Sequence, residues 1–112
     1  METWHDLLRR EFDQAEAARR RGNEGQARVC ARRAAGVAIR EYLARRGRLV
    51  RSASAMDLLN LLKAEAALPE ELKPIIEHLT VRVTEEFRLP VEADLVAEAR
   101  TLCDALLGMA PP

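Results

Sequence analysis

The sequence predicts an all-α protein, an antiparallel up-and-down bundle of four to five helices. Apolar residues recur at helical spacing along most of the chain, cap-forming residues precede the apolar runs, and no segment shows a convincing strand pattern. The chain has 112 residues and 48% of them are hydrophobic. A single domain spanning residues 1–112 can therefore bury a core without help from a metal or a disulfide.

The first helix is expected over residues 3–21. Thr3 can cap its start, with Asp6 in the capping-box position. An apolar stripe follows, formed by Trp4, Leu7, Leu8, Phe12, Ala15 and Ala18. Glu11 interrupts this stripe, and we expect it to pair with an arginine of the next helix. Gly22 suits the left-handed position that ends a helix, and so short a turn makes the next helix antiparallel.

The second helix, expected over residues 24–46, has two different faces. One face is lined mostly by small side chains: Ala27, Cys30, Ala31, Ala34, Val37, Ala38 and Tyr42. The other carries Arg28, Arg32, Arg33 and Arg40. Because small side chains let neighbouring helices approach closely, we place this helix at the centre of the bundle, with its arginines at the surface. Cys30 and Cys103 both fall on apolar faces and are expected to be buried thiols.

The remaining helices are expected over residues 54–67, 70–83 and 91–107. Ser54 can cap the first of them, which has the most hydrophobic face in the chain. The segment LPEEL, residues 68–72, predicts a short turn before the next helix, since Pro69 within it and Pro74 just after it each suit the first residue of a helical turn.

The charge is balanced overall but unevenly distributed. Residues 19–51 hold eleven arginines against two acidic residues, whereas residues 1–18 and 52–112 are both acidic. This basic segment has two explanations, which the sequence leaves open. Its arginines can contact phosphate groups of a nucleotide or RNA, or they can pair with carboxylates inside the fold or across a dimer. For phosphate contact the relevant residues are Arg28, Arg32, Arg33 and Arg40.

No motif for a metal, a dinucleotide or a P-loop occurs, so we expect neither a metal site nor a cofactor. Histidine is the usual general acid or base near neutral pH, and the chain has two, His5 and His78, which we expect to be surface or boundary residues. The chain also lacks an apolar run long enough to cross a bilayer, and its first residues are charged. We therefore expect a cytoplasmic protein without membrane contact.

The order of elements resembles the HEPN family of small helical-bundle domains. The similar parts are the opening helix pair with its Gly-Asn turn, the segment SAMDLLNLL, the turn LPEEL and the closing segment VEADLVAEARTLCDALL. The resemblance implies a homodimer, sometimes encoded beside a nucleotidyltransferase partner as a toxin-antitoxin pair.

Members of that family that cleave RNA share an arginine followed at a short, defined spacing by histidine. Here Arg82 is followed at the allowed positions by Phe87, Arg88 and Leu89, so the motif is absent. The nearest imitation is Lys73 followed by His78, with lysine in place of arginine, and the resemblance makes this pair a weak catalytic candidate. The resemblance thus implies a noncatalytic module that binds a nucleotide, RNA or a protein partner. Two alternatives remain: a metal-independent ribonuclease that uses His78, and a purely structural dimeric interaction protein.

Overall fold

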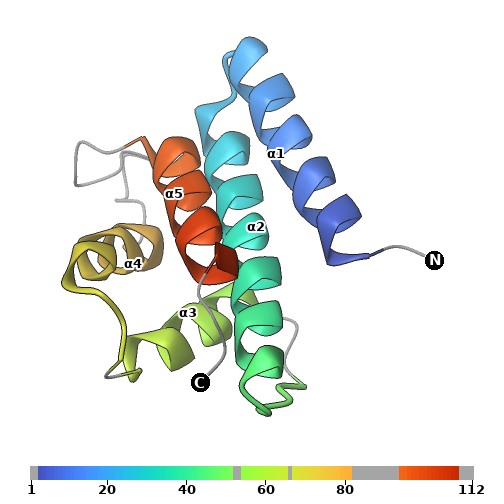
Figure 1. Ribbon diagram of the computed structural model, residues 1–112. Coiled ribbons are helices and arrows are strands. Elements are labelled where there is room, and N and C mark those ends of the chain that lie inside the picture. The colour runs from blue at the N-terminus through green and yellow to red at the C-terminus, as the bar shows by residue number, and fades with distance from the viewer. Residues whose placement is uncertain (1–2, 52–53, 66, 82–93, 109–112) are drawn as a thin grey trace.

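The computed structural model describes residues 3–51, 54–65, 67–81 and 94–108. They form five α-helices and one 3-10 helix: α1 (Trp4–Arg20), α2 (Glu24–Arg45), α3 (Ala55–Lys63), η1 (Glu70–Leu72), α4 (Lys73–Thr80) and α5 (Leu95–Gly108) (Figure 1). None of the described residues forms a strand. The predicted all-α helical bundle is confirmed.

Helix α2 lies at the centre of the bundle, between α1 and α5 (Figure 1). Its small-residue face is buried as expected, and only Val37 of that set is partly exposed. Ala35, Ile39 and Leu43 are buried as well, so the core covers a wider arc of α2 than the predicted face. Both cysteines are buried free thiols, and burial raises the pKa of the Cys103 thiol to about 12.

The helices do not all alternate in direction, as they would in an up-and-down bundle. Helices α1 and α2 are antiparallel, but α5 runs in the same direction as α2 (Figure 1). At one end, Arg19 Nη2 lies 2.6 Å from Glu24 Oε1 and 2.9 Å from Asp94 Oδ1, which joins the end of α1 to the starts of α2 and α5. At the other end, Arg45 Nη1 donates to the Leu107 carbonyl at 2.8 Å. The chain between α2 and α5 therefore returns to the end where α2 begins.

In Figure 1, α3 lies across the lower part of α2 and α4 lies beside α5, and both belong to the part of the chain that makes this return. The crossing of α3 over α2 is close because Gly36 faces Ala55. A Cβ atom placed on Gly36 would lie 3.3 Å from both the Cα and the Cβ of Ala55. The absence of a side chain at Gly36 thus lets α3 lie directly against α2.

The predicted helix starts are mostly confirmed. Thr3 and Asp6 form the reciprocal capping box, and Asn23 and Ser54 each accept a backbone N–H at the start of their helix. Gly22 has a φ of 75°, the left-handed conformation expected after α1. Local sequence chemistry therefore determines where these helices begin.

Three predicted helices differ in extent from the observed ones. The range 54–67 was too long, because Ala64 and Glu65 donate to carbonyls three residues back and the helix ends at Lys63. The range 70–83 is divided into η1 and α4, which ends at Thr80; residues 82–83 lie outside the described residues. The range 91–107 also begins outside them, and α5 itself starts at Leu95, after Asp94, whose Oδ1 accepts the Ala97 N–H.

Candidate functional site: a basic and apolar groove beside helix α2

A surface groove with a volume of about 510 Å³ runs between α2, the first half of α1 and the start of α3. We call it the α2 groove. Its lining residues are Leu7, Glu11, Val29, Arg32, Arg33, Gly36, Val37, Arg40, Ser54, Ala55, Met56 and Leu58. Three of the four arginines predicted to bind phosphate therefore lie in one hollow, together with hydrophobic side chains and a single acidic residue.

Arg33 and Arg40 are the exposed arginines of the α2 groove. They stand seven residues apart, which is two helical turns, so both project from the same side of α2. The N-terminal end of α3 also lines the groove through Ser54 and Ala55, and its helix dipole adds partial positive charge there. The arrangement can hold an anionic group, either a phosphate or a carboxylate.

Arg32 has a structural role that the sequence analysis missed. Its Nε donates to the Leu79 carbonyl at 2.8 Å and its Nη2 to the Val81 carbonyl at 3.1 Å. These acceptors lie at the C-terminal end of α4, where carbonyls lack helical partners. Burial lowers the pKa of Arg32, and the charge of nearby Arg28 lowers it further. Arg32 therefore attaches α4 to α2, and these two donors are not available to a ligand.

Arg28 does not line the α2 groove. Its side chain is partly buried on α2, one turn before Arg32. From the sequence alone, the four arginines share one face of α2. In the structure, Arg33 and Arg40 are exposed in the α2 groove, whereas Arg28 and Arg32 are partly buried. The predicted binding set is thereby reduced to Arg33 and Arg40.

Glu11 is the acidic residue of the α2 groove. The expected pairing with an arginine of the second helix is electrostatic: the charges of Arg33 and Arg10 favour the ionised carboxylate. Burial opposes them and is the larger effect, so the pKa of Glu11 is raised. Its Oε2 atom is buried and has no hydrogen-bond partner among the described residues. Glu11 is thus a partly buried carboxylate whose charge is incompletely compensated.

The two weak catalytic candidates lie apart. Lys73 Nζ bonds to Glu70 Oε1 at 2.8 Å, beside a small hollow that His78 does not line. His78 instead faces α5, where its Nδ1 lies 2.9 Å from Glu98 Oε1 and 3.0 Å from Oε2. The contact links α4 to α5, and it was not visible in the sequence because these residues are twenty positions apart. The structure therefore does not bring Lys73 and His78 into one site.

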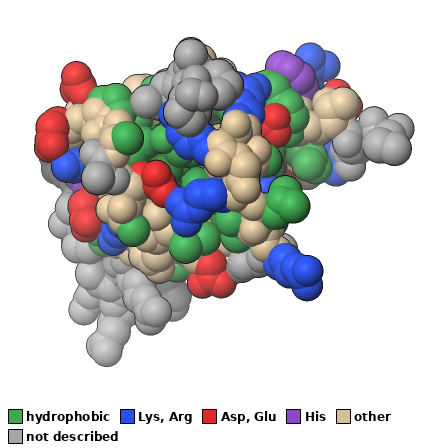
Figure 2. All heavy atoms as spheres, turned by 60° about the horizontal axis from the view of Figure 1, so that its bottom comes forward, with side chains coloured by type: hydrophobic (Ala, Val, Ile, Leu, Met, Phe, Trp, Pro, Cys, Tyr) green, Lys and Arg blue, Asp and Glu red, His purple; other side chains and the backbone are tan. Residues whose placement is uncertain are grey.

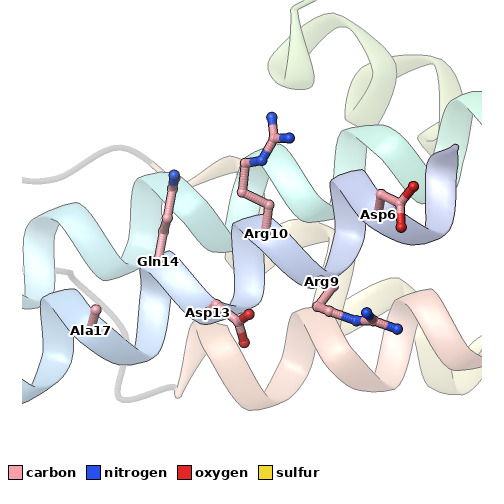
Figure 3. A pocket seen from close by; sticks show the side chains of 6 residues that line it. All are labelled: Asp6, Arg9, Arg10, Asp13, Gln14 and Ala17. Atoms are coloured by element: carbon pink, nitrogen blue, oxygen red, sulfur yellow. The ribbon is translucent and has the colours of Figure 1, made fainter. Parts of the chain in front are cut away.

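Two other hollows lie on either side of α1. One is a depression formed only by α1, where Arg9, Arg10 and Asp13 are among the side chains in Figure 3. Its volume of about 500 Å³ is similar to that of the α2 groove, but no second element encloses it. The other hollow, the α1–α5 groove, has a volume of about 460 Å³ and is lined by Trp4, His5, Leu8, Arg9, Phe12, Asp13, Arg100, Cys103, Asp104 and Leu107.

Within residues 3–51, 54–65, 67–81 and 94–108, no three histidine, cysteine or acidic side chains gather closely enough to bind a metal ion. None of the helices in the described part of the chain combines the length and the apolar character required to cross a bilayer.

Replacing Arg32 should destabilise the fold but leave Arg33 and Arg40, the exposed arginines of the α2 groove, unchanged. We expect Arg32→Met to lower the free energy of unfolding by about 1.5–3 kcal/mol, because two carbonyls lose a charged donor. Urea denaturation measures this change. Arg20→Met, at an exposed position at the end of α1, is the control, and its effect should be near zero. Equal stability of Arg32→Met and the unsubstituted chain would contradict the structural role.

Glu11 should make stability depend on pH. Below the ordinary pKa of glutamate both states are protonated, but above the raised pKa both are ionised and the folded state bears the cost of the buried charge. Stability is therefore lost as pH rises through this interval. We expect Glu11→Gln to stabilise the protein near pH 7 and to have little effect near pH 3, as measured by urea denaturation. Asp13→Asn, on the exposed side of α1, is the control; a Glu11→Gln effect that is the same at every pH would contradict burial as the cause.

The chain was also compared with known proteins. No family model, curated protein or solved structure matches it.

Proposed function

We propose that this protein is a noncatalytic, HEPN-like binding module that receives an anionic partner in the α2 groove. The observation that carries the proposal is the position of Arg33 and Arg40, both exposed in a groove that has Glu11 as its single acidic lining residue. The groups they bind are phosphates of a nucleotide or RNA, or carboxylates of a protein. We place the module in the cytoplasm, and the resemblance to the HEPN family adds a nucleotidyltransferase-like protein as partner, in the manner of a toxin-antitoxin pair.

The proposal does not extend to RNA cleavage. A general acid or base must lie within hydrogen-bond reach of the reacting group and act together with a second positioned residue. His78 is oriented by Glu98, yet Lys73 bonds to Glu70, and neither residue lines the α2 groove. Binding without catalysis is the function that this geometry supports best.

Replacing both groove arginines tests the proposal. Titrations of ATP, mixed RNA and poly-glutamate against the full chain, over a salt series, should show at least one probe that binds more weakly as salt rises. We expect Arg33→Gln with Arg40→Gln to weaken that binding by about tenfold or more, because two charged donors are lost. The matched control is Arg20→Gln, an exposed arginine at the end of α1, which should leave the affinity unchanged.

Two outcomes would overturn the proposal. If none of the three probes binds even at low salt, the module does not bind anions. If a probe binds but the double substitution and the control weaken it equally, the binding depends on overall charge and does not occur in the α2 groove.

A homodimer belongs to the same proposal, and the α1–α5 groove is the surface that supports it. Each wall of this groove carries one arginine and one aspartate four residues apart: Arg9 and Asp13 on α1, Arg100 and Asp104 on α5. A second copy related by a two-fold axis can complement such a pattern, since the same patch then meets itself.

Sedimentation equilibrium tests the dimer. We expect a dimer at low salt whose dissociation increases with salt, and we expect Asp104→Arg to weaken it by about tenfold or more, because like charges then meet across the two-fold axis. Asp57→Asn, on α3 and outside the α1–α5 groove, is the control. A protein that remains monomeric at every concentration and salt would contradict this part of the proposal.

A further inference from the structure

The α2 groove continues past Arg40 toward the end of α2. A second hollow, with a volume of about 270 Å³, is lined by Trp4, Leu7, Val37, Arg40, Glu41, Ala44, Arg48, Leu49 and Val50. Leu7, Val37 and Arg40 line both hollows, which therefore join along one side of α2. From Val29 to Ala44 this surface follows α2 for about 22 Å, or about four helical turns.

The continuous surface has exposed hydrophobic side chains at its two ends. Val29 has 36% of its surface exposed and lies at one end, and Leu49 has 90% exposed and lies at the other. These two are the large hydrophobic residues that remain exposed in the described part of the chain. In Figure 2, which brings the end of the molecule near Leu49 forward, basic and hydrophobic side chains lie next to one another. A hydrophobic surface bordered by charged side chains is typical of a protein-binding site, and the lining residues Leu7, Val29 and Val37 supply such a surface beside the arginines.

We propose that the occupant is an amphipathic α-helix of a partner protein, with two acidic residues seven positions apart. This inference rests on the proposed function and specifies its ligand. Arg33 and Arg40 are separated by two turns, about 10.5 Å along α2. On a helix lying beside α2, residues i and i+7 have the same separation and share one face. In an extended strand the matching separation is about three residues, which places the second side chain on the opposite face.

The charges of the groove and the small side chains in its lining both favour such a helix. Acidic side chains at the two positions would meet Arg33 and Arg40, and apolar side chains near its ends would cover Val29 and Leu49. An arginine has five N–H donors, so bonds that Arg40 makes within the protein leave others for a carboxylate. The alanines at positions 44 and 55 contribute little side-chain bulk to the lining, which helps a partner helix approach.

Peptide binding measured by fluorescence anisotropy tests the inference on the full chain. The first peptide is an amphipathic helix of about 16 residues with glutamates at i and i+7 and leucines at both ends. The second has the same composition but its later glutamate is moved two positions, to the opposite face. A third carries a central proline that breaks the helix. We expect the first to bind about tenfold or more tightly than the others, since each loses one charged contact or the helical shape.

Substitutions separate the parts of the inference. Leu49→Ser should weaken the first peptide but leave the affinity for poly-glutamate, ATP or RNA unchanged, because only the helix uses the apolar ends. Arg33→Gln with Arg40→Gln should weaken all ligands that bind, and Arg20→Gln should weaken none. If the first and second peptides bind equally, or if RNA or ATP binds and the first peptide does not, the helix inference is wrong while the anion-binding proposal stands. If nothing binds at low salt, the proposed function itself fails.

Discussion

The close packing of the small-residue face of α2 is the constraint on which the rest of the structure depends. Alanines at positions 27, 31, 34, 35 and 38 are completely buried, so neighbouring helices lie near the backbone of α2. Gly36 extends this effect to α3, which crosses so close that a Cβ atom at position 36 would crowd Ala55. A central helix of larger residues would hold its neighbours farther away and would change every contact around it.

The arginines of α2 have different roles because its neighbours surround it unequally. On the side covered by α4, Arg32 completes the hydrogen bonding of two terminal carbonyls and is partly buried. On the side left open between α1 and α3, Arg33 and Arg40 remain exposed. Adjacent residues of one sequence pattern thus differ in their surroundings: Arg32 bonds to the end of α4 and Arg33 is exposed in the α2 groove, because a rotation of about 100° separates them on the helix.

Ionic contacts connect helices that the hydrophobic core alone would hold less specifically. Arg19 joins α1, α2 and α5 at one end, and its hydrogen bonds lower the pKa of Asp94. The His78–Glu98 contact joins α4 to α5. Such partly exposed contacts contribute modestly to stability, but each requires one particular arrangement of the helices and so favours a single packing. The helices that bound the α2 groove are therefore held in place by contacts with more than one part of the fold.

The sequence by itself determined the helical class, the central place of α2 and the helix starts, because apolar periodicity and cap residues such as Thr3, Asn23 and Ser54 act over a few neighbouring positions. It also indicated which residues carry the positive charge. Only the tertiary structure decided the parallel direction of α5, the contact of Arg32 with α4, the partial burial of Glu11 and the meeting of Arg33 and Arg40 with α3 in one groove. These features depend on contacts between residues far apart in the chain, and local patterns carry no information about which distant surfaces will meet.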